Sequence, residues 1–469
     1  MTERVEHRFK TRQTIGMKHL VGLVTLCLIS CAWANEKILS RFVGSSPLET
    51  ASVGVCIIPM KSDVAMLQWQ ADLGLMPAST MKAITTATAL EILGADYVFE
   101  TKIYLKGDDL VVKGGGDPTL GSSSLTGDFV PWLKALKEKG VSEIKGDLLM
   151  DDTHFESQTT PNEWPWGDVG NYYGAGPSGL NYHQNLFTLT FQPGSVGGPA
   201  KLSKVWPEPP GVDFENHMRT GSSGSGDKGY VYSGPRATRI SMRGTVPAGR
   251  AFSIKGALPD PPQMCGVALK KYLEDQGMSV AGEVRVGKVS LSELTPIYVL
   301  KSPNLAKIAK GTNYRSVNLY ADSIFKALTK SGTTKAAEAK VRSHWKKLGV
   351  DLKGYVMQDG SGLSPRNTVT ARQIATILKK ARREEKGKAF YDSLPVAGQS
   401  GTLATFGRGT AVAGRVRAKS GSLTRVRTYT GYLKAKSGDE FAFAVFVNNE
   451  ISSSKLSISK LLGSFILKN

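Results

Sequence analysis

The first residues that could do chemistry are Ser79 and Lys82, in the stretch PASTMK that begins at Pro77. Apolar residues recur at helical spacing after Ser79, so the serine and the lysine would lie one turn apart on the same helical face. A lysine removed from water can lose its proton near neutral pH and activate a neighbouring hydroxyl. The free N–H groups at a helix start would stabilise negative charge beside Ser79. The pair therefore predicts a serine nucleophile with a lysine base.

The spacing Ser-x-x-Lys alone is weak evidence, because it recurs elsewhere in the chain and an N-cap serine followed by a solvated lysine usually explains it. A second polar group, Ser316-Val317-Asn318, falls between two segments with helical periodicity, where a loop can present polar side chains to a cleft. We expect Asn318 to bind a substrate amide, and Ser316 to relay a proton between Lys82 and the leaving nitrogen. A similar triplet, Ser302-Pro303-Asn304, contains a proline, and Ser302 is expected to cap the next helix.

The tripeptide Lys-Ser-Gly occurs at 330–332, 419–421 and 436–438. The first copy ends a helical segment, where the glycine is a C-cap, and the third lies at a predicted hairpin turn. The copy at 419–421 alone enters a strand that follows Ser316 in the chain. This copy is the candidate for the catalytic site.

Each residue of this copy suits a role beside a bound substrate. Lys419 would supply positive charge for a substrate carboxylate, and Ser420 would hydrogen-bond it. Gly421 would let the substrate approach the backbone. The N–H of Ser422, with that of Ser79, would form an oxyanion hole.

Several elements must position these residues. Strands are predicted over 52–59 and 65–70, followed by the helix that carries Lys82. From about 101 to 262 the chain is rich in short strand-like runs, glycine and proline. Helical periodicity returns at 263, and a hairpin and a last helix end the chain. The order predicts one α/β domain, residues 35–100 and 263–469, split in sequence by a large β-rich insertion of one or more domains at 101–262.

The N-terminus resembles a targeting signal. An apolar run over 20–34 follows the basic residues Arg8, Lys10, Arg12 and Lys18 and ends in Ala32-Trp33-Ala34. This pattern favours a secretory signal peptide over residues 1–34 that is cleaved before Asn35. Either Met1 or Met17 could be the start. Two alternatives are a lipoprotein anchored at Cys31 and a buried N-terminal helix.

The four cysteines fall in two parts of the chain. Two of them lie in the predicted signal, so Cys56 and Cys265 would remain in the mature chain. Cys56 lies in an apolar run, which favours a small core residue. A disulfide between Cys56 and Cys265 is the alternative in an oxidising compartment.

Charge and residue composition indicate which partners and cofactors to expect. The formal net charge is +20, yet no zinc spacing, recognition-helix pattern or RNA-binding aromatic motif accompanies it, so we expect no nucleic-acid partner. An acidic polymer, or peripheral association with a membrane or wall surface, suits the charge equally well. The six histidines are scattered and form no metal motif, so we expect neither metal nor cofactor.

An ordered set of motifs gives the chain a family resemblance. The set comprises PASTMK at 77–82, GGGDPTL at 114–120, WPW at 164–166, SVN at 316–318, DGSGLS at 359–364, LPVAGQSGTL at 394–403 and KSGSL at 419–423. In this order the chain resembles the class C low-molecular-mass penicillin-binding proteins, the D-alanyl-D-alanine carboxypeptidase/endopeptidases. The resemblance covers nearly the whole mature chain. It implies a transpeptidase-like α/β domain with a large insertion, and a periplasmic enzyme.

The resemblance also assigns roles to residues of this sequence. It implies an acyl-enzyme on Ser79, formed from peptidoglycan stem peptides, from their crosslinks, or from β-lactams. Lys82 matches the base; the second and third motifs match at Ser316, Asn318, Lys419, Ser420 and Gly421. The family's third motif more often has threonine at 420, and Ser420 keeps the hydroxyl.

Two further features concern substrate preference. In some family members an acid and an aromatic residue from the insertion reach the cleft, and Asp151 and Phe155 match them by position. The family's basic residue after the Gly-Ser-Gly-Leu-Ser stretch is displaced here, since Pro365 precedes Arg366.

Two other functions use the same scaffold. A β-lactamase would share the nucleophile, but no Glu-x-x-Leu-Asn loop lies between the motifs, and the insertion is longer than that fold uses. A non-catalytic wall-binding protein is the other alternative, and the three intact motifs argue against it.

Overall fold

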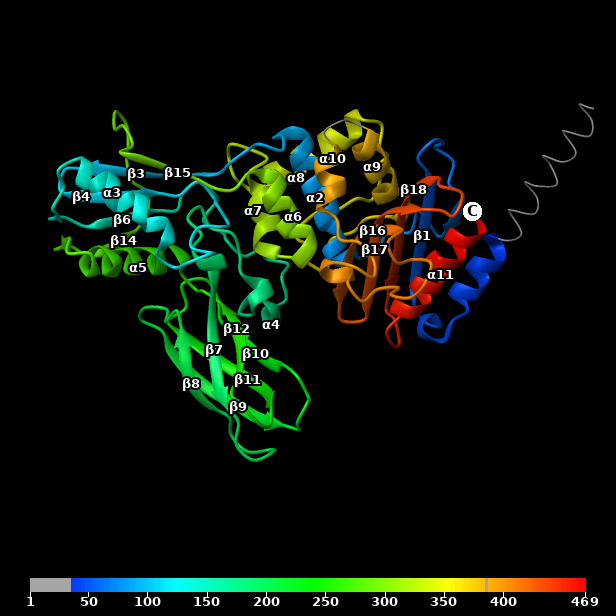
Figure 1. The fold of residues 1–469 in the computed structure, drawn as a ribbon, viewed down its shortest axis with the longest axis horizontal. Coiled ribbons are helices and arrows are strands. Elements are labelled where there is room, and N and C mark those ends of the chain that lie inside the picture. Colours follow the sequence, from blue (N-terminus) through cyan, green and yellow to red (C-terminus); the bar gives the residue numbers. More distant parts are fainter. Residues whose placement is uncertain (1–34, 384–386) are drawn as a thin grey trace, which may run out of the picture.

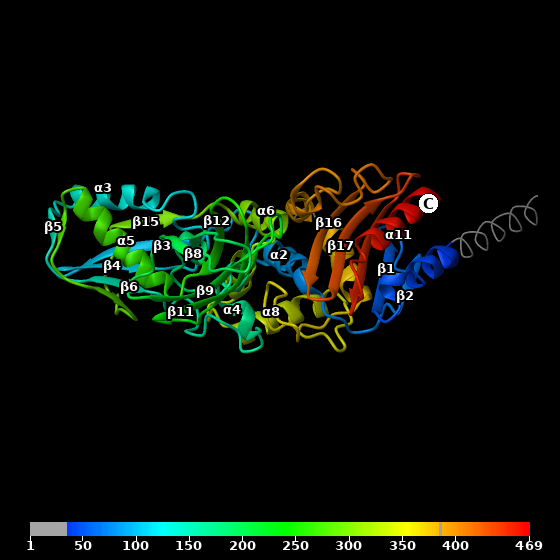
Figure 2. The ribbon, with the colours of Figure 1, turned by 90° about the horizontal axis from the view of Figure 1, so that it is seen from below.

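The computed structural model describes residues 35–383 and 387–469. The chain forms two parts that lie side by side along the long axis (Figures 1 and 2). One part, the main domain, contains residues 35–99 and 302–469. The other part, the inserted region, contains residues 100–301. The chain crosses between them at one place, where the N–H of Ser302 donates to the carbonyl of Phe99 over 3.0 Å.

The main domain is built on a five-stranded antiparallel sheet of order β16-β17-β18-β1-β2. The first and last parts of the chain meet in it, because β1 pairs with β18 from Ser52↔Asn448 to Pro59↔Phe441. The strands are β1 (Ser52–Pro59), β2 (Leu67–Trp69), β16 (Val416–Leu423), β17 (Val426–Lys434) and β18 (Glu440–Asn448).

Helices cover both faces of this sheet, which explains why β1 and β18 are continuous apolar runs rather than alternating ones. On one face the core includes α2 (Met81–Ile92), α7 (Asn318–Lys326), α8 (Thr334–Lys347) and α9 (Ala371–Arg383), with α6 (Leu305–Arg315) and α10 (Gly387–Ser393) beside them. On the other face lie α11 (Lys455–Lys468) and the helical residues 35–43. This arrangement confirms the predicted α/β domain divided by an insertion.

The inserted region begins with a sheet of order β14-β6-β4-β3-β15. Helix α5 packs on β6 and β14 of this sheet, and α3 lies against β15. The elements are β3 (Glu100–Lys106), β4 (Asp109–Lys113), α3 (Val130–Glu138), β6 (Leu148–Asp151), α5 (Pro261–Asp275), β14 (Val284–Val286) and β15 (Tyr298–Lys301), and a short pair, β5 (Glu143–Ile144) with β13 (Ser279–Val280), lies at its edge.

The rest of the inserted region consists of two three-stranded sheets that project from the long axis in Figure 1. Their orders are β12-β7-β8 and β10-β11-β9. The strands are β7 (Leu186–Gln192), β8 (Lys201–Trp206), β9 (Asp213–Gly221), β10 (Lys228–Tyr232), β11 (Arg239–Pro247) and β12 (Phe252–Ala257). One apolar core contains residues from all four sheets of the inserted region.

Three details differ from the sequence analysis. The inserted region extends past residue 262 to Lys301, because α5, β14 and β15 complete its first sheet rather than the main domain. Asn304, not Ser302, caps α6, and its side chain accepts from the N–H of Lys307. Cys56 and Cys265 are free and buried in the cores of different parts, so they form no disulfide.

The predicted signal peptide, its alternative start at Met17 and the lipoprotein site at Cys31 lie outside the described residues. Within residues 35–383 and 387–469, every helix is too short or too polar to cross a membrane.

Candidate active site

Ser79 lies on the 3-10 turn η2 (Ala78–Thr80), immediately before α2. Ala78 has a φ of 48°, a left-handed conformation that is uncommon for alanine. Two glycines pack against this turn. A Cβ on Gly362 would lie 1.9 Å from the carbonyl oxygen of Ala78, and one on Gly421 would lie 2.9 Å from the nitrogen of Ser79. Because only glycine fits at both places, the surrounding loops hold Ser79 in a defined position.

Lys82 is fully buried and faces Ser79. Its Nζ lies 2.9 Å from Oγ of Ser79, 2.5 Å from Oδ1 of Asn318 and 2.6 Å from the carbonyl oxygen of Ser361. Burial lowers the pKa of Lys82 to about 8, although the nearby carboxylates of Asp322 and Asp359 act to raise it. A substantial fraction of Lys82 is therefore neutral close to physiological pH.

The same two buried acids shape the loop that presents the Ser361 carbonyl. Asp322 accepts a hydrogen bond from the N–H of Gly360 over 2.7 Å, and Asp359 accepts one from the N–H of Gly362 over 2.6 Å. Burial, and then the neighbouring Asp359, raise the pKa of Asp322 to about 7 against the lowering effect of Lys82. The DGSGLS segment thus holds the Ser361 carbonyl that accepts from Lys82.

The second motif lies in the turn between α6 and α7. Ser316 is the C-cap of α6 with a φ of 60°, and Asn318 begins α7. The Asn318 side chain has partners at both ends, because its Nδ2 donates to the carbonyl of Tyr173 over 2.6 Å while Oδ1 accepts from Lys82. Asn318 therefore joins Lys82 to the inserted region.

The third motif lies on the edge strand β16. Lys419 is fully buried, and its Nζ donates to the Ser420 carbonyl over 2.6 Å. Burial and the charge of Lys82 lower the pKa of Lys419 well below its usual value. The Ser420 hydroxyl donates to Oγ1 of Thr402 over 3.1 Å, so Thr402 orients it.

These motifs surround a cavity of about 670 Å³, which we call the main cleft. It lies where the main domain meets the inserted region, and both contribute to its walls. Its lining includes Ser79, Arg315, Ser316, Asn318, Thr402 and Ser422 of the main domain, and Pro165, Asp168, Tyr172 and Tyr173 of the inserted region. No group of described His, Cys, Asp and Glu side chains is arranged to hold a metal ion. The cleft has the parts of a serine acyl-transfer site.

Comparison with known proteins agrees with this geometry. The model of the D-Ala-D-Ala carboxypeptidase 3 (S13) family matches residues 35–462. The chain belongs to this family. A D-alanyl-D-alanine carboxypeptidase of Actinomadura sp. strain R39 is 30% identical over 429 residues, which cover 86% of this chain and 78% of that protein.

A sequence and a crystal structure named DacB, both from Haemophilus influenzae, extend the comparison of this S13 family chain. The carboxypeptidase DacB is 24% identical over 431 residues, with 85% of this chain and 86% of that protein covered. The crystal structure of penicillin-binding protein 4 superposes with a TM-score of 0.79 at 21% identity, covering 92% of this chain and 98% of that one. The penicillin-binding fold predicted from the sequence is confirmed.

The inserted region does bring an acid and an aromatic residue to the cleft of this S13 protein, but they are not the pair chosen from the sequence. Asp168 and Tyr173 line the main cleft, and the Tyr173 hydroxyl donates to Oδ1 of Asp168 over 3.2 Å. Burial raises the pKa of Asp168, and the hydrogen bond from Tyr173 acts against that shift.

Asp151 and Phe155 lie away from the main cleft lining. The Asp151 carboxylate is bonded to Lys113 over 2.7 Å and to the N–H of Val289, so it ties strands of the inserted region together. Phe155 is only 4% exposed and packs in the apolar core. Position along the chain did not identify an acid that lines the cleft, because the Asp151 carboxylate, at the end of β6, bonds to groups of the inserted region.

Two of the family motifs, WPW and DGSGLS, contact each other. Trp164, from the WPW stretch, donates its indole N–H to Oδ2 of Asp359 over 2.8 Å. Both side chains are buried. The inserted region therefore fastens the loop that carries the Ser361 carbonyl.

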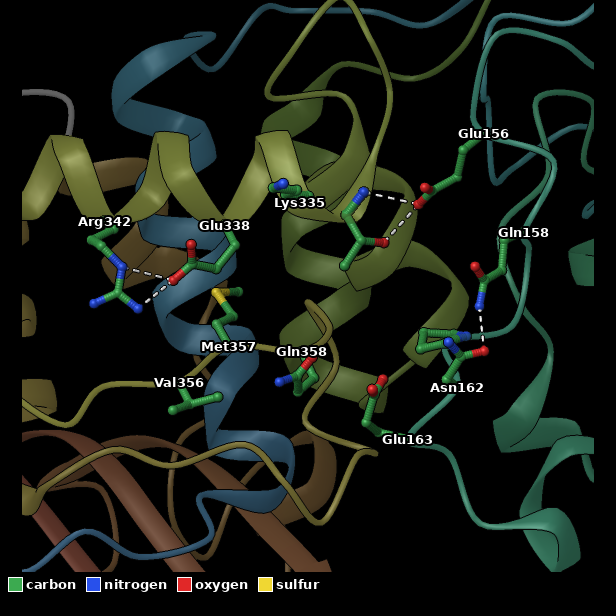
Figure 3. Close-up of a pocket in the computed structure, with 12 residues that line it drawn as sticks. Glu156, Gln158, Asn162, Glu163, Lys335, Glu338, Arg342, Val356, Met357 and Gln358 are labelled. Carbon is green, nitrogen blue, oxygen red and sulfur yellow. Dashed lines mark hydrogen bonds and ion pairs between the residues drawn. The ribbon is translucent and has the colours of Figure 1, made fainter.

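A second cavity, about 390 Å³, is lined by residues of α8, of the 156–163 segment and of the 356–358 segment (Figure 3). Three of its charged side chains have partners: Glu338 accepts from Arg342 over 2.8 Å, and Glu156 accepts from the N–H of Thr334 over 2.8 Å. We call it the paired-charge cavity. It contains none of the three motifs and is not the catalytic site.

Proposed function

We propose that this protein is a serine D-Ala-D-Ala carboxypeptidase and DD-endopeptidase that acts on peptidoglycan peptides through an acyl-enzyme on Ser79. Family membership supports the reaction class. Among the solved structures of similar fold is a predatory peptidoglycan endopeptidase of Bdellovibrio bacteriovorus, with a TM-score of 0.51 at 18% identity.

One observation carries the proposal. Lys82 has two fixed acceptors, Oδ1 of Asn318 and the Ser361 carbonyl, in addition to the Ser79 hydroxyl. A neutral amine has two hydrogens and one lone pair. The two hydrogens satisfy the two fixed acceptors, and the lone pair is left for the proton of Ser79. Since a protonated lysine would satisfy the same three oxygens, it is these contacts together with the lowered pKa of Lys82 that support its role as base.

In the proposed reaction, Oγ of Ser79 attacks the carbonyl carbon of the penultimate D-Ala while Lys82 takes its proton. The N–H groups of Ser79 and Ser422 would stabilise the oxyanion. The C–N bond then breaks, and the leaving nitrogen receives the proton through Ser316. Water finally cleaves the Ser79 ester and regenerates the hydroxyl. A β-lactam would enter the same first step and leave Ser79 acylated.

Lys419 contributes through its burial. It is neutral more readily than an exposed lysine, since its pKa is lowered, and a substrate carboxylate reaching Ser420 would favour its protonated form. We propose that the enzyme works outside the cytoplasm, where the wall lies, and that its net charge of +20 favours contact with anionic wall polymer.

Product analysis tests this function. The wild-type protein and Ser79→Ala would be incubated with a pentapeptide ending in D-Ala-D-Ala, with crosslinked muropeptides and with fluorescent penicillin. We expect wild type to release D-Ala, to cleave the crosslink and to be labelled, and the variant to do none of these.

The two alternatives give different results. Rapid turnover of penicillin by wild type, without action on peptides, would indicate a β-lactamase. Absence of labelling and of products, with retained wall binding, would indicate a non-catalytic wall-binding protein.

A further inference from the structure

A third cavity, which we call the side pocket, adjoins the main cleft. It has a volume of about 360 Å³ and is lined by residues of β7 and β12 on one side and by the 315–319 turn on the other. Tyr172, Tyr173, Arg315, Ser316 and Asn318 line both cavities. The two cavities therefore share a wall at the second motif.

The backbone at this junction is held in an uncommon conformation on both sides. Ser316 has a φ of 60°, and across the side pocket Gln184 has a φ of 56°, within a run of three left-handed residues, 183–185. The surrounding hydrogen bonds maintain the run, since Oδ1 of Asn185 accepts from the N–H of Tyr182 over 2.9 Å. Sparsely populated backbone conformations concentrate where function requires them.

The charges of the side pocket are not neutralised. Arg315 and Lys255 are exposed, and neither forms an ion pair with any residue that the structure describes. The one acid of the lining, Asp227, accepts a hydrogen bond from the N–H of Gly229 over 2.9 Å. The pocket therefore carries one excess positive charge, in contrast to the paired-charge cavity, where Glu338 pairs with Arg342. An anionic ligand suits it.

The proposed reaction indicates which ligand that is. The leaving nitrogen receives its proton at Ser316, so any group attached to that nitrogen extends past Ser316. In carboxypeptidase action this group is a single D-Ala, which the main cleft can hold alone. In endopeptidase action it is a second stem peptide with free carboxylates, which needs further space and positive charge.

We propose that the side pocket binds the carboxylate-bearing leaving peptide of crosslinked peptidoglycan, and that Lys255 and Arg315 select crosslinked over uncrosslinked substrate. This inference rests on the proposed function. The bond that breaks is the amide between D-Ala and the side-chain amine of the second peptide. The amine leaves with the proton that Ser79 loses.

Charge reversal at one lysine tests the side pocket. Lys255→Glu, on β12, removes a cation from the pocket without touching the main cleft lining. Lys204→Glu is the matched control, because it makes the same change on β8, an exposed position of the same sheet that does not line the pocket. The measurements are kcat/KM for crosslinked muropeptide dimers, kcat/KM for D-Ala release from a pentapeptide monomer, and the rate of labelling by fluorescent penicillin.

We expect Lys255→Glu to lower dimer cleavage about fivefold to tenfold, with D-Ala release and labelling within about twofold of wild type. Lys204→Glu should leave all three within about twofold. An equal fall in all three for Lys255→Glu, or no fall in any, would overturn the inference. A wild type that releases D-Ala but never cleaves dimers would also overturn it while leaving carboxypeptidase action intact. Absence of labelling and of both products in wild type would instead refute the proposed function.

Discussion

The main cleft and the paired-charge cavity are both bounded by the segment from Val356 to Pro365. The charged side chains at the two places differ in burial and in ion pairing. In the paired-charge cavity, Glu338 and Arg342 are partly exposed and neutralise each other. Beneath the residues that line the main cleft, Lys82 and Lys419 are fully buried, and neither forms an ion pair with a described residue.

Paired charges are typical of a structural surface, as in the paired-charge cavity, whereas buried unpaired amines are typical of a catalytic site. A paired surface charge keeps its ordinary protonation state and contributes little free energy. A buried amine without an acidic partner is costly to charge, so its proton is easily given up. The first kind of cavity could tolerate substitution, and the second should not.

The largest effect is expected where the buried amine is removed. Lys82→Met keeps the length and burial of the side chain but removes the base, so acylation of Ser79 by fluorescent penicillin should slow by about a thousandfold or more. Stopped-flow labelling measures the rate, and circular dichroism confirms the fold. Acylation within tenfold of wild type would show that another group deprotonates Ser79.

A smaller loss is expected where the position of the nucleophile is disturbed. Gly421→Ala would place a Cβ 2.2 Å from Oγ1 of Thr428 and 2.9 Å from the nitrogen of Ser79, which forces β16 away from the turn. A displacement of about 1 Å costs about a hundredfold in rate. Gly438→Ala is the control, since a Cβ there meets no atom, although its φ of 97° makes some loss of stability expected. Equal acylation rates for both variants would refute the role of Gly421.

The protonation state of Lys82 predicts how the rate of acylation depends on pH. Only the neutral amine accepts the Ser79 proton, and the pKa is about 8, so acylation should rise about tenfold per pH unit up to pH 7 and level off above 8. Asp322→Asn removes a carboxylate that raises this pKa, while its amide oxygen can still accept from Gly360. The midpoint should therefore move to lower pH. A midpoint that stays fixed, or moves upward, would contradict the assignment.

The smallest effect is expected in the paired-charge cavity. Glu338→Gln breaks the ion pair with Arg342 at nearly constant volume, and an exposed pair of this kind contributes less than about 1 kcal/mol to the free energy of unfolding. Acylation should stay within about twofold of wild type, and thermal unfolding should shift by a few degrees at most. A tenfold loss of acylation would show that this cavity communicates with the site.

Residue types and their order in the chain were enough to select the residues that the structure brings together at Ser79. Ser79, Lys82 and Asn318 are far apart in the chain, yet the structure brings their reactive atoms within hydrogen-bonding distance. Each occurs in a short motif, and the order of the motifs along the chain distinguished them from similar triplets elsewhere. The fold followed from the order of strands, helix, β-rich insertion, helices and hairpin, and the structure then pairs β1 with β18 in one covered sheet.

What the sequence did not show depends on tertiary contacts. The periodicity of α5 gives its apolar face but not the sheet that the face covers, so the end of the inserted region was placed too early. Asp151 and Asp168 are both acids of the inserted region, and only the fold reveals that Lys113 occupies the first while the second lines the cleft. Ser361 contributes a carbonyl, which no side-chain motif can signal.

The hydrogen bond from Trp164 to Asp359 limits how this enzyme can be shortened or recombined. Although the chain crosses between its parts only at Phe99 and Ser302, a truncation at that junction would delete the indole that closes the base's scaffold and the Tyr173 carbonyl that holds Asn318. A chimera with the inserted region of a relative would need to transfer residues 164–173 together with residues 356–365. The two parts therefore depend on each other structurally, although the sequence alone would suggest two separable domains.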